Sequence, residues 1–197
     1  MRSKLLLAIV ATVALTGCVK DKPIAQVTTA KITEPGAQGF DVFAARRAAG
    51  EKLPYLQGMN TLTVRTFHHV PSKKSKKRFK REEMIDADCH IDGVGFKGRV
   101  KTPGQVRVPD YGRASRQVSV RCNKPGYKSG FSNVAAFDVD KNARRAAGAN
   151  EGIIGLVVVE IINAADDDED NEFDYRPAHV YMNPVNCEAT KQGCRTK

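Results

Sequence analysis

The sequence lacks the patterns that most directly identify an enzyme, a metal site or a membrane-spanning protein. It contains no His-Glu-x-x-His, no Gly-x-Ser-x-Gly and no Gly-rich phosphate-binding loop, so catalysis is only a remote alternative. No two cysteines have the close CxxC spacing of a zinc site. The apolar stretch near the start covers only eleven residues, Leu5 to Leu15, and is too short to span a bilayer. We therefore predict no catalytic residue, no metal and no cofactor.

The start of the chain does contain an export signal. Arg2 and Lys4 precede the apolar stretch, which ends at Leu15-Thr16-Gly17-Cys18, and this order is typical of a secretory signal. The last four residues resemble the lipobox of bacterial lipoproteins. The resemblance implies cleavage after residues 1–17, with diacylglycerol and a fatty acid such as palmitate attached at Cys18. Val19 stands where the best-known sorting rule would need Asp for inner-membrane retention, which implies the outer membrane, facing the periplasm.

The charge of the mature chain indicates anionic partners. The whole chain has a formal net charge of +10, of which the signal carries two positive charges. An excess of this size favours binding to anions. Because an exported protein does not meet chromosomal DNA, we expect lipid phosphates, lipopolysaccharide or peptidoglycan as partners, and no nucleic acid.

The cysteine count is even once the lipid is considered. Assigning Cys18 to lipidation leaves four cysteines, which suits an oxidising compartment. They allow three pairings, of which the nearest-neighbour pairing is the simplest. The predicted disulfides are Cys89 with Cys122 and Cys187 with Cys194.

Both central cysteines fall on the apolar faces of predicted strands. In each strand, apolar residues alternate with polar ones, as expected where one face is buried. This parity is what a buried disulfide between strands requires, and it independently supports pairing the two. The apolar positions are Ile85, Ala87, Cys89 and Ile91 in one strand and Val118, Val120 and Cys122 in the other.

The mature chain divides into a tether, a domain and a tail. Residues 18–38 are polar without periodicity, which predicts a mostly unstructured, lipid-anchored tether. A domain follows over 39–186, and the tail 187–197 is pinned by the second disulfide. Asp41 begins a predicted helix with Arg46 and Arg47 on its solvated side. The predicted elements are helices over 42–49 and 138–147 and strands over 61–70, 85–91, 106–108, 117–122 and 178–182.

A dense cationic run follows the first predicted strand. Pro71 is expected to end that strand, and seven of the nine residues from 73 to 81 are Lys or Arg. Such a run cannot be buried, so we predict a long hairpin loop or disordered excursion over 72–83. It is either a solvated loop or a site that grips lipid phosphates or lipopolysaccharide. The candidate anion-binding residues are Lys73, Lys74, Lys76, Lys77, Arg78, Lys80 and Arg81.

Two segments near the C-terminus allow less definite predictions. Residues 153–162 are apolar, and their β-branched side chains favour a buried strand while their length permits a helix. An acidic loop follows over 165–174. It lacks the glycine and glutamate that an EF-type calcium loop requires, which favours an intramolecular contact with the basic run.

The stretch from 89 to 127 resembles the PEGA-type repeat and its disulfide-bearing relatives among small bacterial lipoproteins. The resemblance implies a small β-sandwich at the cell envelope and carries no catalytic residue. Within the resembling stretch, Tyr127 is expected to anchor the corner where the chain bends after its second strand. The matching residues are Thr102-Pro103-Gly104, Val106, Val108, Val118, Val120, Cys122, Lys124, Gly126 and Tyr127.

Together these observations predict a mainly β domain with short helices, a small PEGA-like β-sandwich after a lipidated flexible N-terminus. We expect a non-catalytic lipoprotein attached to the membrane through its lipid, which binds envelope glycan or anionic lipid. The alternative is an accessory subunit of an envelope protein assembly.

Overall fold

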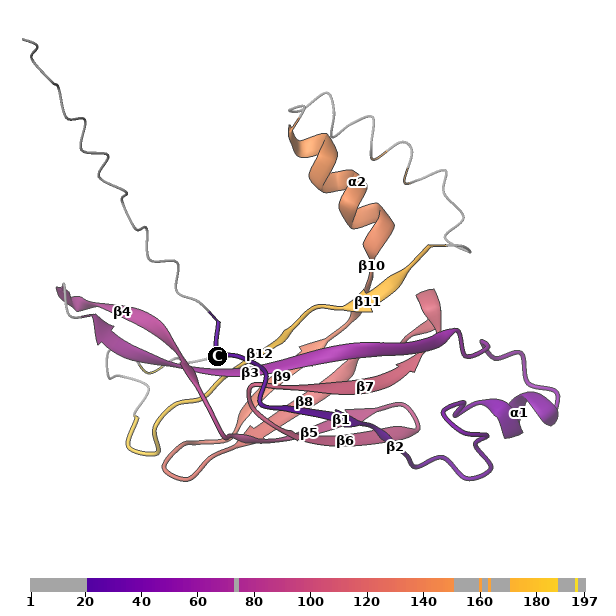
Figure 1. Cartoon of the computed structure of the whole chain (residues 1–197), viewed down its shortest axis with the longest axis horizontal. Coiled ribbons are helices and arrows are strands. Elements are labelled where there is room, and N and C mark those ends of the chain that lie inside the picture. Colours follow the sequence, from indigo (N-terminus) through magenta and orange to yellow (C-terminus); the bar gives the residue numbers. More distant parts are fainter. Residues whose placement is uncertain are drawn as a thin grey trace, which may run out of the picture.

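The computed structural model describes residues 21–72, 75–150, 160, 163, 171–187 and 194, with residues 75–78 described by their backbone. Strands predominate in this part of the chain, accompanied by two short α-helices and a 3-10 turn. Figure 1 shows two layers of strands, with a small ribbon and a helix projecting from them. The prediction of a mainly β fold with short helices is confirmed.

The first sheet is built around one long strand, β3 (Gly58–Ser72). Its first half pairs antiparallel with β7 (Gly104–Asp110), and its second half pairs antiparallel with β4 (Ser75–Met84). β12 (Ala178–Tyr181) lies parallel to its middle, and β1 (Gln26–Thr29) lies parallel to the other side of β7. β3 therefore runs from the body of the sheet into a hairpin with β4.

The second sheet is antiparallel throughout. β6 (Phe96–Lys101) pairs with β2 (Lys31–Ile32) on one side and β5 (Asp88–Gly93) on the other. β5 then pairs with β8 (Val118–Asn123), and β8 with β9 (Gly130–Val134). The chain passes between the two sheets from β1 to β2, from β2 to β3, from β4 to β5, from β6 to β7 and from β7 to β8.

The core lies between the sheets because alternate strand residues turn inward. Leu62 of β3, Val106 of β7 and Ile91 of β5 belong to one buried cluster. Gly98 of β6 allows this close packing, since a Cβ added there would lie 3.0 Å from Val106 Cγ1 and 3.4 Å from Ile91 Cβ. The two sheets therefore form a sandwich with a single main core.

Smaller elements lie around the sandwich. α1 (Ala44–Ala48) precedes β3, and the 3-10 turn η1 (Gly112–Ala114) follows β7. β10 (Ala136–Asp138) pairs antiparallel with β11 (Phe173–Tyr175), and α2 (Val139–Asn150) leaves this ribbon directly. Figure 1 shows α2 projecting away from both sheets.

A second, smaller cluster fixes the segment that contains α1. Val42, Phe43 and Tyr111 are buried together, and the Val42 N–H donates to Tyr111 Oη at 2.8 Å. Arg47 pairs with Asp41, and both side chains are mostly buried. The prediction that Arg47 lies on the solvated side is therefore wrong, whereas Arg46 is about half exposed and pairs with Glu51.

The segment predicted as an unstructured tether contains two strands, β1 and β2. Thr28 of β1 lies opposite Val106 in a parallel ladder, and the Ala25 N–H donates to the Pro103 carbonyl at 2.8 Å. These strands are short and held by main-chain hydrogen bonds. Because their side chains are largely exposed, as for Val27 at 62%, they carry no apolar periodicity. The prediction of an unstructured tether is wrong for residues 26–32.

The strand predicted to begin at Ile85 begins at Asp88. Asp86 has a positive φ of 59°, which turns the chain as it passes from the first sheet to the second. As a result Met84 is buried and Ile85 is 52% exposed, while the alternation from Ala87 onward holds.

The other predicted elements correspond to strands β3, β7, β8 and β12 and to helices α1 and α2. Of the apolar segment 153–162, the structure describes Glu160, which has a helical backbone. Of the predicted acidic loop 165–174, residues 165–170 lie outside the described residues, and Phe173 and Asp174 belong to strand β11, so the loop prediction is wrong for these two. No helix in the described part of the chain is long and apolar enough to cross a membrane.

Candidate functional site

The cationic run lies mostly on β4, in a hairpin whose pairing passes from Phe79 to Ser75 across a shift in register. β3 and β4 pair from Thr66 opposite Met84 out to Ser72 opposite Ser75. Pro71 lies inside this ladder, next to a shift in register, and does not end β3. The prediction of a loop is thus wrong for residues 75–83, because a sheet edge accepts both Pro and charged side chains. Figure 1 shows the hairpin extending past the two sheets.

The described cations of the hairpin have different surroundings. The Lys80 side chain is 59% exposed and lies 3.9 Å from a Glu82 oxygen, a contact that contributes little in water. The Arg81 guanidinium lies over the ring of buried Phe67, 4.4 Å from its centroid. Lys73 and Lys74 lie outside the described residues, while Lys76, Lys77 and Arg78 lie on β4.

The base of the hairpin holds the start of the described chain. The Arg65 Nη1 donates to Glu83 Oε1 at 2.6 Å, across the β3–β4 ladder, and both side chains are mostly buried. The backbone N–H of Lys22 donates to the other Glu83 oxygen at 2.8 Å. The Lys22 carbonyl accepts from Arg65 Nη1 at 2.9 Å. One ion pair therefore fixes the residue that leads into the sandwich.

This arrangement of Lys22, Arg65 and Glu83 was not predicted from the sequence. Lys22 and Glu83 are 61 positions apart, and no periodicity links them. The available signal was the pair Glu82-Glu83 directly after seven cations, which marks a change of surroundings within one strand.

His179 of β12 lies close to the arginines at the base of the hairpin, which affect its pKa. It packs edge-on against Phe67, with the ring centroids 5.1 Å apart. Burial lowers the pKa of His179, and the positive charges of Arg81 and Arg65 also lower it, while Asp21 and Glu83 oppose them. The positive charges of these two arginines therefore contribute to the lowered pKa of a residue on β12.

A groove of about 530 Å³ lies beside the same N-terminal segment. Pro23, Ala25, Ile85 and Pro103 give it apolar walls, and Lys22 also lines it. The exposure of Ile85, which the sequence placed in the core, is thus part of a surface feature. Both the groove and the base of the hairpin lie where the chain enters the sandwich.

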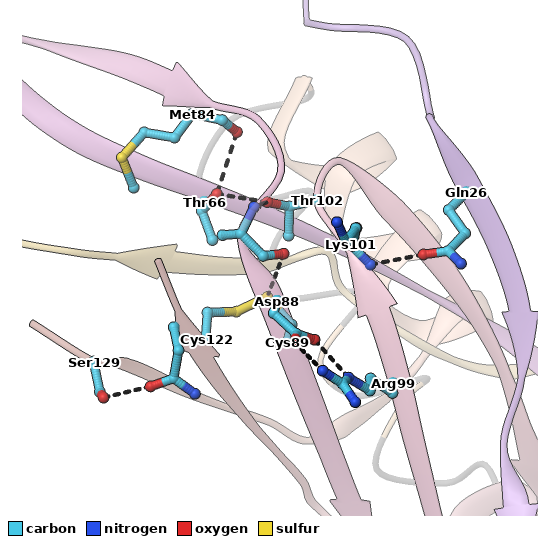
Figure 2. Close-up of a disulfide and its surroundings, with 12 residues drawn as sticks. Gln26, Thr66, Met84, Asp88, Cys89, Arg99, Lys101, Thr102, Cys122 and Ser129 are labelled. Atoms are coloured by element: carbon cyan, nitrogen blue, oxygen red, sulfur yellow. Dashed lines mark hydrogen bonds and ion pairs between the residues drawn. A yellow bond between two sulfur atoms is a disulfide. The ribbon is translucent and has the colours of Figure 1, made fainter. Parts of the chain in front are cut away.

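The predicted disulfide Cys89–Cys122 is confirmed. The two residues lie directly opposite each other on β5 and β8, with a Cα–Cα distance of 4.0 Å, and both are fully buried. Figure 2 shows the bond crossing between the two strands, with Asp88 and Arg99 paired on the outer side. The parity that placed both cysteines on inward faces agrees with this pairing.

A buried polar network lies beside this disulfide. The hydroxyls of Thr66 and Thr102 are 2.8 Å apart, and Thr66 Oγ1 donates to the Met84 carbonyl at 3.2 Å (Figure 2). The backbone N–H of Ala87 donates to Thr102 Oγ1 at 3.2 Å. Each buried hydroxyl thus has a partner, and the network joins β3 to the β4–β5 and β6–β7 connections.

The second predicted disulfide, Cys187–Cys194, is also confirmed. The Cys187 carbonyl accepts a hydrogen bond from Lys128 Nζ at 2.9 Å, which holds this end of the chain to the turn after β8. Residues 188–193 lie outside the described residues.

The side chains of the adjacent His68 and His69 have different contacts. Tyr127 Oη and His68 Nδ1 are 3.1 Å apart, while His69 stacks on Tyr181 with 5.5 Å between the ring centroids. Within the described ranges, no group of three or more His, Cys, Asp and Glu is placed to hold a metal ion.

The residues quoted for the PEGA-like resemblance lie on β7 and β8 and in the turns beside these strands. Thr102 and Pro103 connect β6 to β7, and Gly126 has a positive φ of 81° in the turn after β8. Tyr127 pairs with Pro184 and contacts His68, so it anchors that corner. The valines of β7 and β8 come from different sheets and are buried in the shared core: Val106, Val108, Val118 and Val120.

The fold and its bonds define a mainly β, disulfide-bonded sandwich with a cationic hairpin. No known protein family, no curated protein and no solved structure matches this chain.

Proposed function

We propose that this chain is a non-catalytic lipoprotein of the bacterial cell envelope, which holds its β-sandwich at the surface of the outer membrane and binds an anionic envelope component there. The observation that carries the proposal is the secretory signal ending in Leu15-Thr16-Gly17-Cys18. It is supported by the two disulfides, because such bonds persist in oxidising compartments. Cys18 is the one cysteine outside them.

The binding role is supported by the charge of the chain. A dense group of positive charges lies in the β3–β4 hairpin, which extends past the sandwich. A run of cations this dense favours a polyanionic ligand more than solubility alone requires.

Replacing the lipidation site tests the anchor. We expect the unaltered mature protein to enter the detergent phase of a phase separation and to carry acyl groups on Cys18 by mass spectrometry. The Cys18→Ser variant should stay in the aqueous phase or remain unprocessed, with both disulfides still formed. An unaltered protein in the aqueous phase with an unmodified N-terminus would refute the proposal.

A change at the next residue tests the membrane. By the sorting rule, Val19→Asp should move the protein to the inner membrane, whereas Val19→Ala should leave it in the outer membrane. Density-gradient separation of the two membranes gives the readout. A Val19→Asp protein that stays with the outer membrane contradicts this assignment. Co-purification of a stoichiometric protein from native membranes would instead favour an accessory subunit.

A further inference from the structure

We propose that the β3–β4 hairpin lies against the membrane that holds the lipid anchor and binds the phosphate groups of anionic phospholipids. This inference rests on the proposed function, because it uses the lipid on Cys18 as a fixed point. It adds a specific ligand, a specific surface and an orientation of the sandwich.

The first step is the position of the anchor relative to the hairpin. Lys22 is hydrogen-bonded through both its N–H and its carbonyl to the Arg65–Glu83 pair at the base of the hairpin. Cys18 is four residues before Lys22, so the two Cα atoms are at most about 14 Å apart even with the chain fully extended. A lipid on Cys18 therefore holds the base of the hairpin close to the membrane surface.

The second step is the charge. Residues 73–83 contain seven cations and two carboxylates, and one of these carboxylates, Glu83, is already paired with Arg65. The other, Glu82, is 51% exposed and has only a long contact to Lys80. By formal charge, residues 75–83 of β4 thus carry five cations against these two carboxylates. An anionic bilayer attracts such a basic segment next to it.

The third step is the orientation. Residues 75–83 of β4 span about 27 Å at the usual rise of a strand. The surface potential of a membrane decays over about 8 Å at physiological salt. A hairpin pointing away from the bilayer would thus leave its outer cations beyond the reach of the lipid phosphates. A hairpin lying along the surface brings the cations of β4 within that distance, and the ladder with β3 holds the backbone at Lys80 and Arg81.

The absence of tryptophan from the sequence provides a clean probe. Phe79→Trp places a single fluorophore on β4, and Tyr55→Trp places one near α1, where the native side chain is 75% exposed. The lipidated full-length mature protein is reconstituted into vesicles of phosphatidylcholine alone or with phosphatidylglycerol. Quenching by headgroup-labelled lipid is then measured. We expect strong quenching of the tryptophan at 79 only with phosphatidylglycerol, weakening as salt is raised, and no such change for the tryptophan at 55.

Matched charge variants distinguish the hairpin from net charge. Neutralising three hairpin lysines should lower the ratio of docked to undocked protein about a hundredfold, whereas neutralising three remote lysines should leave it unchanged. Both sets keep the long side chain and the same total charge, so circular dichroism should show folded protein in each. The hairpin set is Lys76→Gln, Lys77→Gln and Lys80→Gln, and the remote set is Lys31→Gln, Lys52→Gln and Lys97→Gln.

Three results would overturn the inference. These are equal quenching of the tryptophan at 79 in neutral and anionic vesicles, equal effects of the two lysine sets, and quenching only when lipopolysaccharide replaces phosphatidylglycerol. An N-terminus without acyl groups would instead refute the proposed function. The same vesicles would then still report whether the hairpin alone contacts phosphatidylglycerol.

Discussion

Replacing both Cys89 and Cys122 with alanine is expected to lower the free energy of unfolding by about 4 kcal/mol. The bond closes a loop with a sequence separation of 33, and loop-closure entropy alone gives about 3.7 kcal/mol at 25 °C. Both side chains are fully buried, so removing the two sulfur atoms also leaves unfilled space in the core and adds to the loss. Domains of this size are stable by about 5–15 kcal/mol, so the variant should retain only part of its stability.

The second disulfide provides the matched control. Cys187 and Cys194 are separated by seven positions, so the same reasoning gives at most about 2.4 kcal/mol for replacing both with alanine. Guanidinium titrations without reductant, followed by far-ultraviolet circular dichroism, measure both losses. A larger loss for the C-terminal pair than for Cys89 and Cys122 would refute the reasoning from loop length and burial.

Two further predictions concern the core and its edges. Burial raises the pKa of Tyr111 and of Tyr175 to about 12, so the stability that their neutral forms contribute is complete below pH 10 and is lost as the pH rises from 10 to 12. Absorbance at 295 nm should show these two phenols ionising later than the others, and simultaneous ionisation would contradict it. Gly130→Ala should destabilise by about 1–3 kcal/mol, because its Cβ would lie 2.6 Å from the Tyr181 carbonyl oxygen, whereas Gly58→Ala meets no atom within 4 Å. Thermal melts of both variants test this, and equal losses would contradict it.

The parts of the fold that the sequence predicted are those where one face is buried. Cys89 and Ile91, like Val118, Val120 and Cys122, alternate with exposed residues, and burial enforces that alternation. Because the pattern reports which way a side chain points, it predicted the strands and supported the nearest-neighbour disulfide between them.

The parts that the sequence did not predict depend on contacts between distant backbones. β1 and β2 are held by ladders to β7 and β6, and any sequence with free N–H and C=O groups could form those bonds. The exposed Ile85 depends on a single residue, Asp86, which turns the chain through a positive φ. Neither effect leaves a periodic trace in the residues concerned.

The sequence predicted which residues form the candidate site, but it did not predict the secondary structure of their segment. The cations from 73 to 81 are evident from the sequence, yet their repulsion indicated a loop where β4 forms a paired strand. The fixed position of Lys22 depends on an ion pair between β3 and β4, which exists only once the hairpin has formed.

The parallel pairing of β1 with β7 also determines how the sandwich resists a mechanical load. A pull applied at the N-terminal side of residue 21 acts first on the two hydrogen bonds of Lys22 and then along the axis of β1. The paired positions from Gln26 to Thr29 share that load in shear, since the hydrogen bonds lie across the direction of pull and must break together. A force on this end of the chain is therefore borne by a main-chain ladder before it reaches the apolar core.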